Sequence, residues 1–181
     1  MKRTTLMGVT ALASLGLLTA CGGGQTPAAE APAEEAAAEA PAEEVVEVPA
    51  VEANGTVIEI EMYTKDPDDS SKLQVYKPRL VTANVGDTIK FVPTNKTHQS
   101  SSIDGMLPAG VEGWEGKINE EVSYVIQAPG VYGYKCVPHY AAGMVGLIVV
   151  EGGDNAEAAK AVKHPGLANR AFGEIFEEAG L

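Results

Sequence analysis

Residues 130–150 read GVYGYKCVPHYAAGMVGLIVV, and this stretch decides the fold. Two runs rich in apolar and aromatic residues, 131–136 and 145–150, have the length and composition of β-strands. Three side chains with soft or borderline metal-binding groups lie from the last residue of the first run to the start of the second: Cys136, His139 and Met144. The stretch therefore predicts two consecutive strands joined by a loop that can bind a metal ion.

Shorter runs of strand character lie upstream of this stretch. Apolar residues alternate with glutamates over 56–62, which is typical of a strand with one buried face. Three further runs have a similar composition and are bounded by turn residues: 80–85, 88–92 and 122–127. Many short strands separated by turns predict an all-β protein built as a β-sandwich.

The spacing of apolar residues changes after Gly152-Gly153. Asp154 or Asn155 can cap a helix that runs to about Lys163. The sequence His164-Pro165-Gly166 then ends this helix. Five apolar residues follow at helical spacing and form one stripe: Ala168, Phe172, Ile175, Phe176 and Ala179. We therefore expect two short C-terminal α-helices packed on the sandwich.

A second histidine, His98, follows the predicted strand 88–92 and completes a possible ligand set. A thiolate, two imidazoles and a thioether are the ligands of a blue copper electron-transfer site. Thiolate and thioether favour Cu(I), whereas imidazoles favour Cu(II). A site with two imidazoles and a thiolate in one plane and a weak axial thioether is a compromise between the two oxidation states. Its geometry therefore changes little when the copper is reduced. The predicted cofactor is one copper ion, and the predicted ligands are His98, Cys136, His139 and Met144.

Two other methionines compete with Met144 for the axial position. Met62 falls on the buried face of strand 56–62 and is expected in the core. Met106 lies in a segment rich in Gly and Pro, where we expect it to line an apolar patch around the site.

The ligand loop resembles that of a known family. Residues 130–140 and 143–146 resemble the copper loop of pseudoazurins, and 105–108 and 117–120 resemble that family's middle segments. The resemblance implies a cupredoxin Greek-key sandwich with a type 1 copper ion that carries single electrons in the periplasm, often to a copper nitrite reductase. The chain departs from the family pattern at two positions next to ligands: Gln99 stands where Asn is usual and Val137 where Thr is common.

The N-terminus has the features of an export signal. A basic start, Met1-Lys2-Arg3, precedes an uncharged run over 6–20 that is short for a membrane span but suits a signal peptide. The run ends in Leu18-Thr19-Ala20-Cys21, which resembles the lipobox of bacterial lipoproteins. We therefore predict that Cys21 carries lipid and anchors the protein to a bacterial membrane. Cys136 is then left as a lone thiol with no disulfide partner.

Composition and charge separate the remaining regions. The chain has 181 residues and a formal net charge of −12, which argues against nucleic acid as a partner. Residues 22–53 contain eight glutamates, many Ala and Pro, and no basic or aromatic residue, which predicts a disordered spacer. The predicted organisation is a signal peptide at 1–20, the lipidated cysteine and linker at 21–53, and a cupredoxin domain at 54–181.

Other functions can use the same residues. A periplasmic copper store or chaperone would have the same ligands and exchange the metal. An enzyme that pairs Cys136 with a histidine as nucleophile leaves Met144 without a role. A structural zinc site is disfavoured because Met is a poor zinc ligand. The sequence therefore favours a non-enzymatic electron carrier, which we expect to be a monomer that meets its redox partners transiently.

Overall fold

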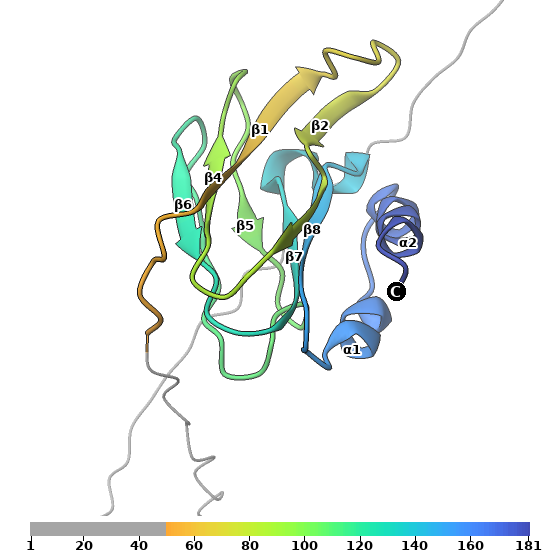
Figure 1. Ribbon diagram of the computed structural model, residues 1–181. Coiled ribbons are helices and arrows are strands. Elements are labelled where there is room, and N and C mark those ends of the chain that lie inside the picture. The colour runs from red at the N-terminus through yellow and green to blue at the C-terminus, as the bar shows by residue number, and fades with distance from the viewer. Residues whose placement is uncertain (1–49) are drawn as a thin grey trace, which may run out of the picture. The chain divides into compact units, whose positions relative to one another are not determined.

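Two four-stranded sheets form the body of the domain (Figure 1). The computed structural model describes residues 50–181, so the predicted signal peptide, Cys21 and most of the predicted linker lie outside the described residues. The first sheet has the order β2-β1-β4-β6 and contains β1 (Val57–Lys65), β2 (Leu73–Lys77), β4 (Thr88–Val92) and β6 (Val122–Val125). The second has the order β3-β8-β7-β5 and contains β3 (Leu80–Ala83), β5 (Ser101–Ser102), β7 (Gly130–Lys135) and β8 (Val145–Val150).

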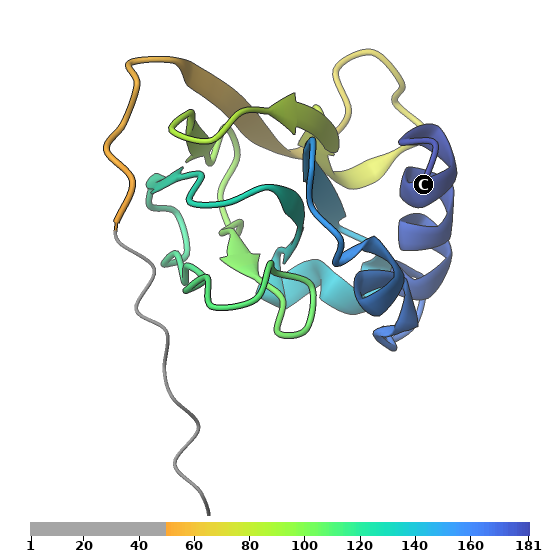
Figure 2. The ribbon, with the colours of Figure 1, turned by 60° about the horizontal axis from the view of Figure 1, so that its bottom comes forward.

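Three helical segments complete the described chain. A 3₁₀ segment, η1 (Val137–Ala142), joins β7 to β8, while α1 (Ala156–Ala161) and α2 (Ala168–Glu178) follow β8. The two α-helices lie beside the second sheet, as both views of the ribbon show (Figures 1 and 2). Strands β1 and β4 pair in parallel, as do β3 and β8, and the other pairs are antiparallel. The prediction of an all-β sandwich with two short C-terminal helices is confirmed.

The inner faces of the two sheets form the main core, and the alternation in the sequence explains it. Ile60 and Met62 of β1 are fully buried, as are Ile89 and Phe91 of β4. Aromatic rings fill the centre, where the Phe91 ring stacks on Trp114 with centroids 5.3 Å apart. Burial of this apolar surface is the main stabilising contribution. The expectation that Met62 belongs to the core is confirmed.

Strands β2 and β5 were not anticipated from the sequence. In β2, Leu73 is 60% exposed and only Tyr76 is buried, so the strand has no apolar alternation to detect. Strand β5 has only two residues, Ser101 and Ser102, which pair with the end of β7. Both strands are held by pairing with neighbours rather than by their own hydrophobic pattern.

A second core lies between the outer face of the β3-β8-β7-β5 sheet and the helices. The predicted stripe of α2 provides much of it, since Ala168, Phe172, Ile175 and Phe176 are buried. Met106 belongs to this second core and is fully buried, so the expectation that it lines an apolar surface patch is wrong. The reason is Gly133, which lacks a side chain and leaves room for Met106 against the strand.

Asn155 occupies the position before α1, but its side chain does not cap the helix. Instead, the Asn155 amide donates to the Val131 carbonyl oxygen at 2.9 Å, and its Oδ1 accepts from the Val131 backbone N–H at 2.8 Å. These two bonds connect the start of α1 to the beginning of strand β7. The capping role predicted for Asp154 or Asn155 is therefore replaced, for Asn155, by a connection between helix and sheet.

Candidate metal centre

The loop after β7 places three of the predicted ligands. Cys136 follows the strand directly, and the His139 backbone N–H donates to the Cys136 carbonyl oxygen at 3.0 Å. The Met144 N–H donates to His139 at 3.2 Å, and the Cys136 N–H donates to Met144 at 3.0 Å. Pro138 suits the first turn of η1, where no backbone donor is needed, and Gly143 ends it in the left-handed region with φ +93°. These bonds close a compact ligand loop.

His98 reaches the same place from the loop after β4. Its Nδ1 lies 3.8 Å from Cys136 Sγ, and Nδ1 of His139 lies 3.4 Å from the same sulfur. One ligand atom from each of the three residues lies within 4.8 Å of the others. Met144 is fully buried and belongs to the same core cluster as Cys136. The structure thus brings together two imidazoles and one thiol, with the predicted fourth residue packed nearby.

Thr64, at the end of β1, is a site residue that sequence reasoning missed. Its Oγ1 lies 3.1 Å from Nε2 of His98, and its backbone N–H donates to Asn95 Oδ1 at 3.0 Å. An Nε2–H group of His98 can therefore donate a hydrogen bond to Thr64 Oγ1, which leaves the Nδ1 lone pair on the side of the cysteine. Nothing in the sequence signals this role, because Thr64 and His98 meet only through the pairing of β1 with β4.

Gln99, the first departure from the family pattern, bonds within its own loop. Its side chain is 5% exposed, and its Oε1 accepts from the Ser101 hydroxyl at 3.1 Å. Its backbone carbonyl oxygen accepts from the Tyr76 hydroxyl at 2.6 Å. The Gln99 side chain therefore connects the loop that carries His98 to β5, and the Gln99 backbone carbonyl connects it to β2.

Burial controls the protonation of the ligands. The pKa of Cys136 is raised by burial, although backbone N–H groups of Gln99 and His139 oppose that shift. The pKa of His98 is lowered by burial and by the neighbouring His139, so that His98 is neutral at pH 7. A neutral imidazole is the form that binds a metal, and the thiol must lose its proton when a metal binds.

His139 differs from the other predicted ligands in its exposure. His98, Cys136 and Met144 are fully buried, whereas His139 is only partly buried. The neighbouring residues on η1 are exposed and uncharged: Val137, Pro138, Ala141 and Ala142. Among the four predicted ligands, His139 is therefore the one nearest to the surface.

Comparison with known proteins agrees with this geometry. Residues 63–151 match a family model described as copper binding proteins of the plastocyanin/azurin family. The pseudoazurin of Paracoccus pantotrophus is 41% identical over 117 residues, which cover 64% of this chain and 80% of that protein. The chain belongs to the pseudoazurin family. A second pseudoazurin, from Methylorubrum extorquens, is 41% identical over 107 residues, covering 59% of this chain and 72% of that protein.

A solved pseudoazurin structure from Sinorhizobium has the same fold. It aligns with a TM-score of 0.65 and 40% identity, covering 68% of this chain and 96% of that one. Pseudoazurins are cupredoxins that bind one type 1 copper and transfer electrons to transient partners in the periplasm, and they are not enzymes. The buried thiol and two imidazoles of this chain suit that cofactor, because they are the donor types that a type 1 site requires.

Proposed function

We propose that His98, Cys136, His139 and Met144 bind the copper ion and that electrons enter and leave through the exposed edge of His139. The observation that carries this proposal is the convergence of His98, Cys136 and His139, with only His139 among the four ligands reaching solvent. Bound copper supplies a one-electron couple between Cu(II) and Cu(I). The protein residues hold the ligand atoms in place and exclude water, which lowers the reorganisation that accompanies electron transfer.

The surface around His139 supports docking of a redox partner with an acidic rim. The exposed residues of η1 provide an uncharged centre. Lys65, Lys96 and Lys117 are exposed, and within residues 50–181 none of them forms an ion pair. Each is close in sequence to a residue of the site: Lys65 follows Thr64, Lys96 is two residues before His98, and Lys117 is two residues before Asn119. The Asn119 backbone N–H donates to the His98 carbonyl oxygen. Unpaired lysines beside the site attract an acidic partner and set the encounter rate.

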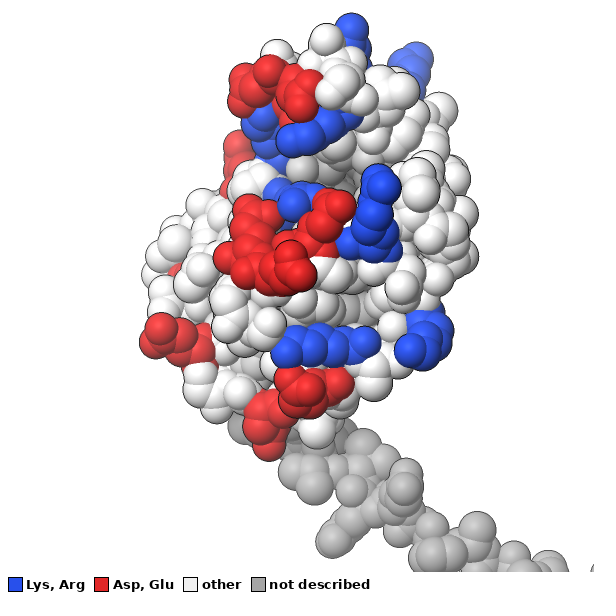
Figure 3. All heavy atoms as spheres, turned by 90° about the vertical axis from the view of Figure 1, so that its right-hand side faces the viewer, with Lys and Arg blue, Asp and Glu red and all other residues white. Residues whose placement is uncertain are grey.

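The side that carries the C-terminal helices offers a different surface. Acidic and basic side chains are interspersed there (Figure 3). Several of them neutralise one another, as in the pairs of Arg79 with Glu174 and Glu178. Mixed and paired charges give weak electrostatic steering, so this side is a poor docking surface for a strongly acidic partner.

A lipid anchor at Cys21 forms the second part of the proposal. The lipobox sequence supports it. The place where the described chain begins bears on how such a tether would orient the domain. The Val51 N–H donates to Gln127 Oε1 at 2.8 Å, and Gln127 lies just before the first residue of β7. Cys136 follows the last residue of the same strand. The six residues of β7 separate these points by roughly 20 Å. A tether that enters opposite the metal centre leaves His139 free to face a partner.

The visible spectrum tests the metal assignment. We expect the purified protein with one equivalent of Cu(II) to show intense thiolate-to-copper charge transfer that ascorbate bleaches. Cys136→Ser should abolish the colour, since the thiolate is its source. Retention of the colour in that variant would contradict the ligand set.

A further inference from the structure

The loop that carries His139 rests on the segment between α1 and α2. The Tyr140 hydroxyl lies 2.6 Å from Nδ1 of His164, and the Leu167 backbone N–H donates to the Ala141 carbonyl oxygen at 2.9 Å. Gly166 approaches the same carbonyl so closely that a Cβ at this position would lie 2.4 Å from the oxygen. Two consecutive residues after His139 are therefore bonded to the C-terminal segment.

Each ring of the Tyr140–His164 pair also contacts a third side chain. The Lys135 ammonium lies 5.1 Å from the centroid of the Tyr140 ring, a cation–π contact. The His164 ring packs on Phe172 with centroids 4.3 Å apart. Phe172 is a core residue of α2 with 2% exposure. A continuous set of contacts thus runs from the buried face of α2 to the residue next to His139.

His139 lacks the side-chain support that His98 has. The Thr64 hydroxyl contacts Nε2 of the His98 ring. Among residues 50–181, the hydrogen-bond contacts of the His139 ring are confined to Cys136 Sγ through Nδ1. His139 also interrupts the helical geometry of η1, with φ −115° and ψ 16°. The position of its ring is therefore set by the backbone of the loop, which makes the anchoring of the next residue important.

We propose that Tyr140 and His164 act as a positioning pair, which holds the His139 loop in its metal-binding geometry and links the C-terminal helices to the metal centre. The inference rests on the proposed copper site, toward which both residues act only indirectly. Loss of the hydrogen bond would free the loop at the one ligand that is open to solvent, and copper would leave from that side.

The test compares variants that remove only the hydrogen bond. Tyr140→Phe keeps the ring under Lys135, and His164→Phe keeps a ring against Phe172. Both variants and the double variant are loaded with copper in the full chain, and the transfer of copper to an excess of chelator is timed. We expect each single variant to lose copper roughly tenfold faster than the unmodified protein. The double variant should be no faster than the single ones, because all three lack the same bond.

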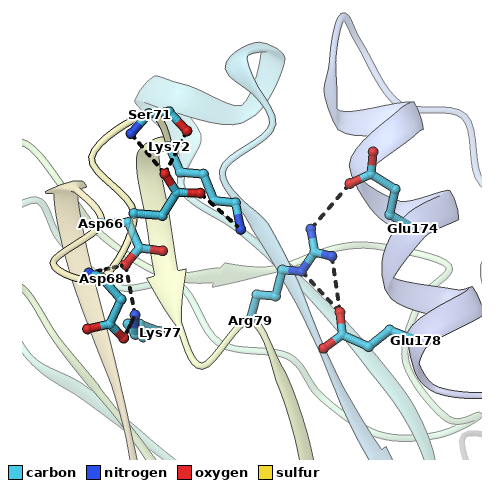
Figure 4. A network of polar contacts seen from close by, with 9 residues as sticks. Asp66, Asp68, Ser71, Lys72, Lys77, Arg79, Glu174 and Glu178 are labelled. Carbon is cyan, nitrogen blue, oxygen red and sulfur yellow. Dashed lines mark hydrogen bonds and ion pairs between the residues drawn. The ribbon is translucent and has the colours of Figure 1, made fainter.

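Arg79→Gln is the matched control. Figure 4 shows Arg79 paired with Glu174 and Glu178 of α2. None of these three residues is bonded to Tyr140 or His164. The change removes exposed ion pairs of α2 without touching Tyr140, His164 or the buried face of the helix, so we expect copper loss at the unmodified rate. Thermal unfolding and circular dichroism of the metal-free variants establish that each is folded.

The spectrum of each copper-loaded variant provides a readout that a purely structural role would not change. A displaced His139 should alter the ratio of the charge-transfer bands and the copper hyperfine splitting in Tyr140→Phe and His164→Phe, but not in Arg79→Gln. Unaltered spectra and release rates in the first two variants would overturn the positioning role, as would equal effects in the control. Failure of the unmodified protein to become coloured would instead overturn the copper site itself.

Discussion

Thr64 and His98 are joined by a contact of 3.1 Å between the Thr64 hydroxyl and Nε2 of the histidine. Because His98 is fully buried, water cannot replace this partner. The Thr64 backbone N–H donates a hydrogen bond to Asn95 Oδ1. This bond fixes the backbone from which the Thr64 hydroxyl extends. The contact therefore fixes the orientation of a predicted ligand whose ring is buried, and it is compatible with a proton on Nε2.

Thr64→Val keeps the shape of the side chain and removes the hydroxyl. We expect a loss of about 10–100-fold in copper affinity, because an outer partner of a ligand histidine is removed. We also expect the metal-free protein to lose about 1–3 kcal/mol of stability from the unpaired ring nitrogen. Chelator competition and chemical unfolding measure the two effects. Thr64→Ser retains the hydroxyl and should remain close to the original protein, and equal affinities for Val and Ser would contradict the role.

Copper binding should release a proton from Cys136. Burial raises the pKa of the thiol, so it is protonated in the metal-free protein at pH 7, and binding requires the thiolate. Below that pKa the affinity should fall about tenfold for each unit decrease in pH. His98, whose pKa is lowered, adds to this dependence only at more acid pH. Calorimetry in two buffers with different ionisation enthalpies counts the protons, and an absence of release near neutral pH would show that the thiolate is already formed.

Ala142→Asp places a charge in the exposed uncharged surface beside His139. We expect slower electron transfer to the physiological acceptor and an almost unchanged copper spectrum, because a partner must expel water from this surface to come close. Stopped-flow oxidation of the reduced protein at fixed ionic strength measures the rate. Glu157→Gln on α1, where Glu157 pairs with Lys160, is the distant control. If Ala142→Asp and Ala141→Asp both react at the original rate, electrons leave by another surface.

Cys21→Ser removes the predicted lipid attachment. The original protein should partition into the detergent phase or the membrane fraction, since two acyl chains give stable anchoring. The variant should appear in the periplasmic soluble fraction with its copper spectrum intact. Equal membrane association of the two proteins would show that the lipobox interpretation is wrong.

Asn155→Ala removes the two hydrogen bonds between the start of α1 and Val131. We expect a loss of about 1–3 kcal/mol in the free energy of unfolding, because the Val131 N–H and carbonyl are left without these partners. Urea unfolding measures the change. Asp154→Ala is the matched control at the adjacent position and should have little effect, and similar losses for both would favour a capping role over the link to β7.

Much of this protein follows from the sequence by itself. The alternation in 56–62 and the apolar runs 88–92 and 145–150 determine strands that the structure places with nearly the same bounds, because each run must bury at least one face and 145–150 buries both. The stripe on α2 likewise determines which face of that helix packs. The spacing of Cys136, His139 and Met144 restricts these residues to one short loop, since few backbone bonds separate them.

Tertiary structure alone decided the remainder. The meeting of His98 with Cys136, the bond from Thr64 to His98 and the pairing of Tyr140 with His164 join segments that are 24 to 38 residues apart. Gly133 admits Met106 into the second core, and Asn155 bonds β7 instead of capping a helix. Local periodicity reports only which face of an element is apolar, whereas these contacts depend on how two sheets and two helices pack. The sequence alone therefore determines which residues form the predicted ligand loop, because they are close in the chain. The contacts that hold this loop in place form only when the sheets and helices pack together.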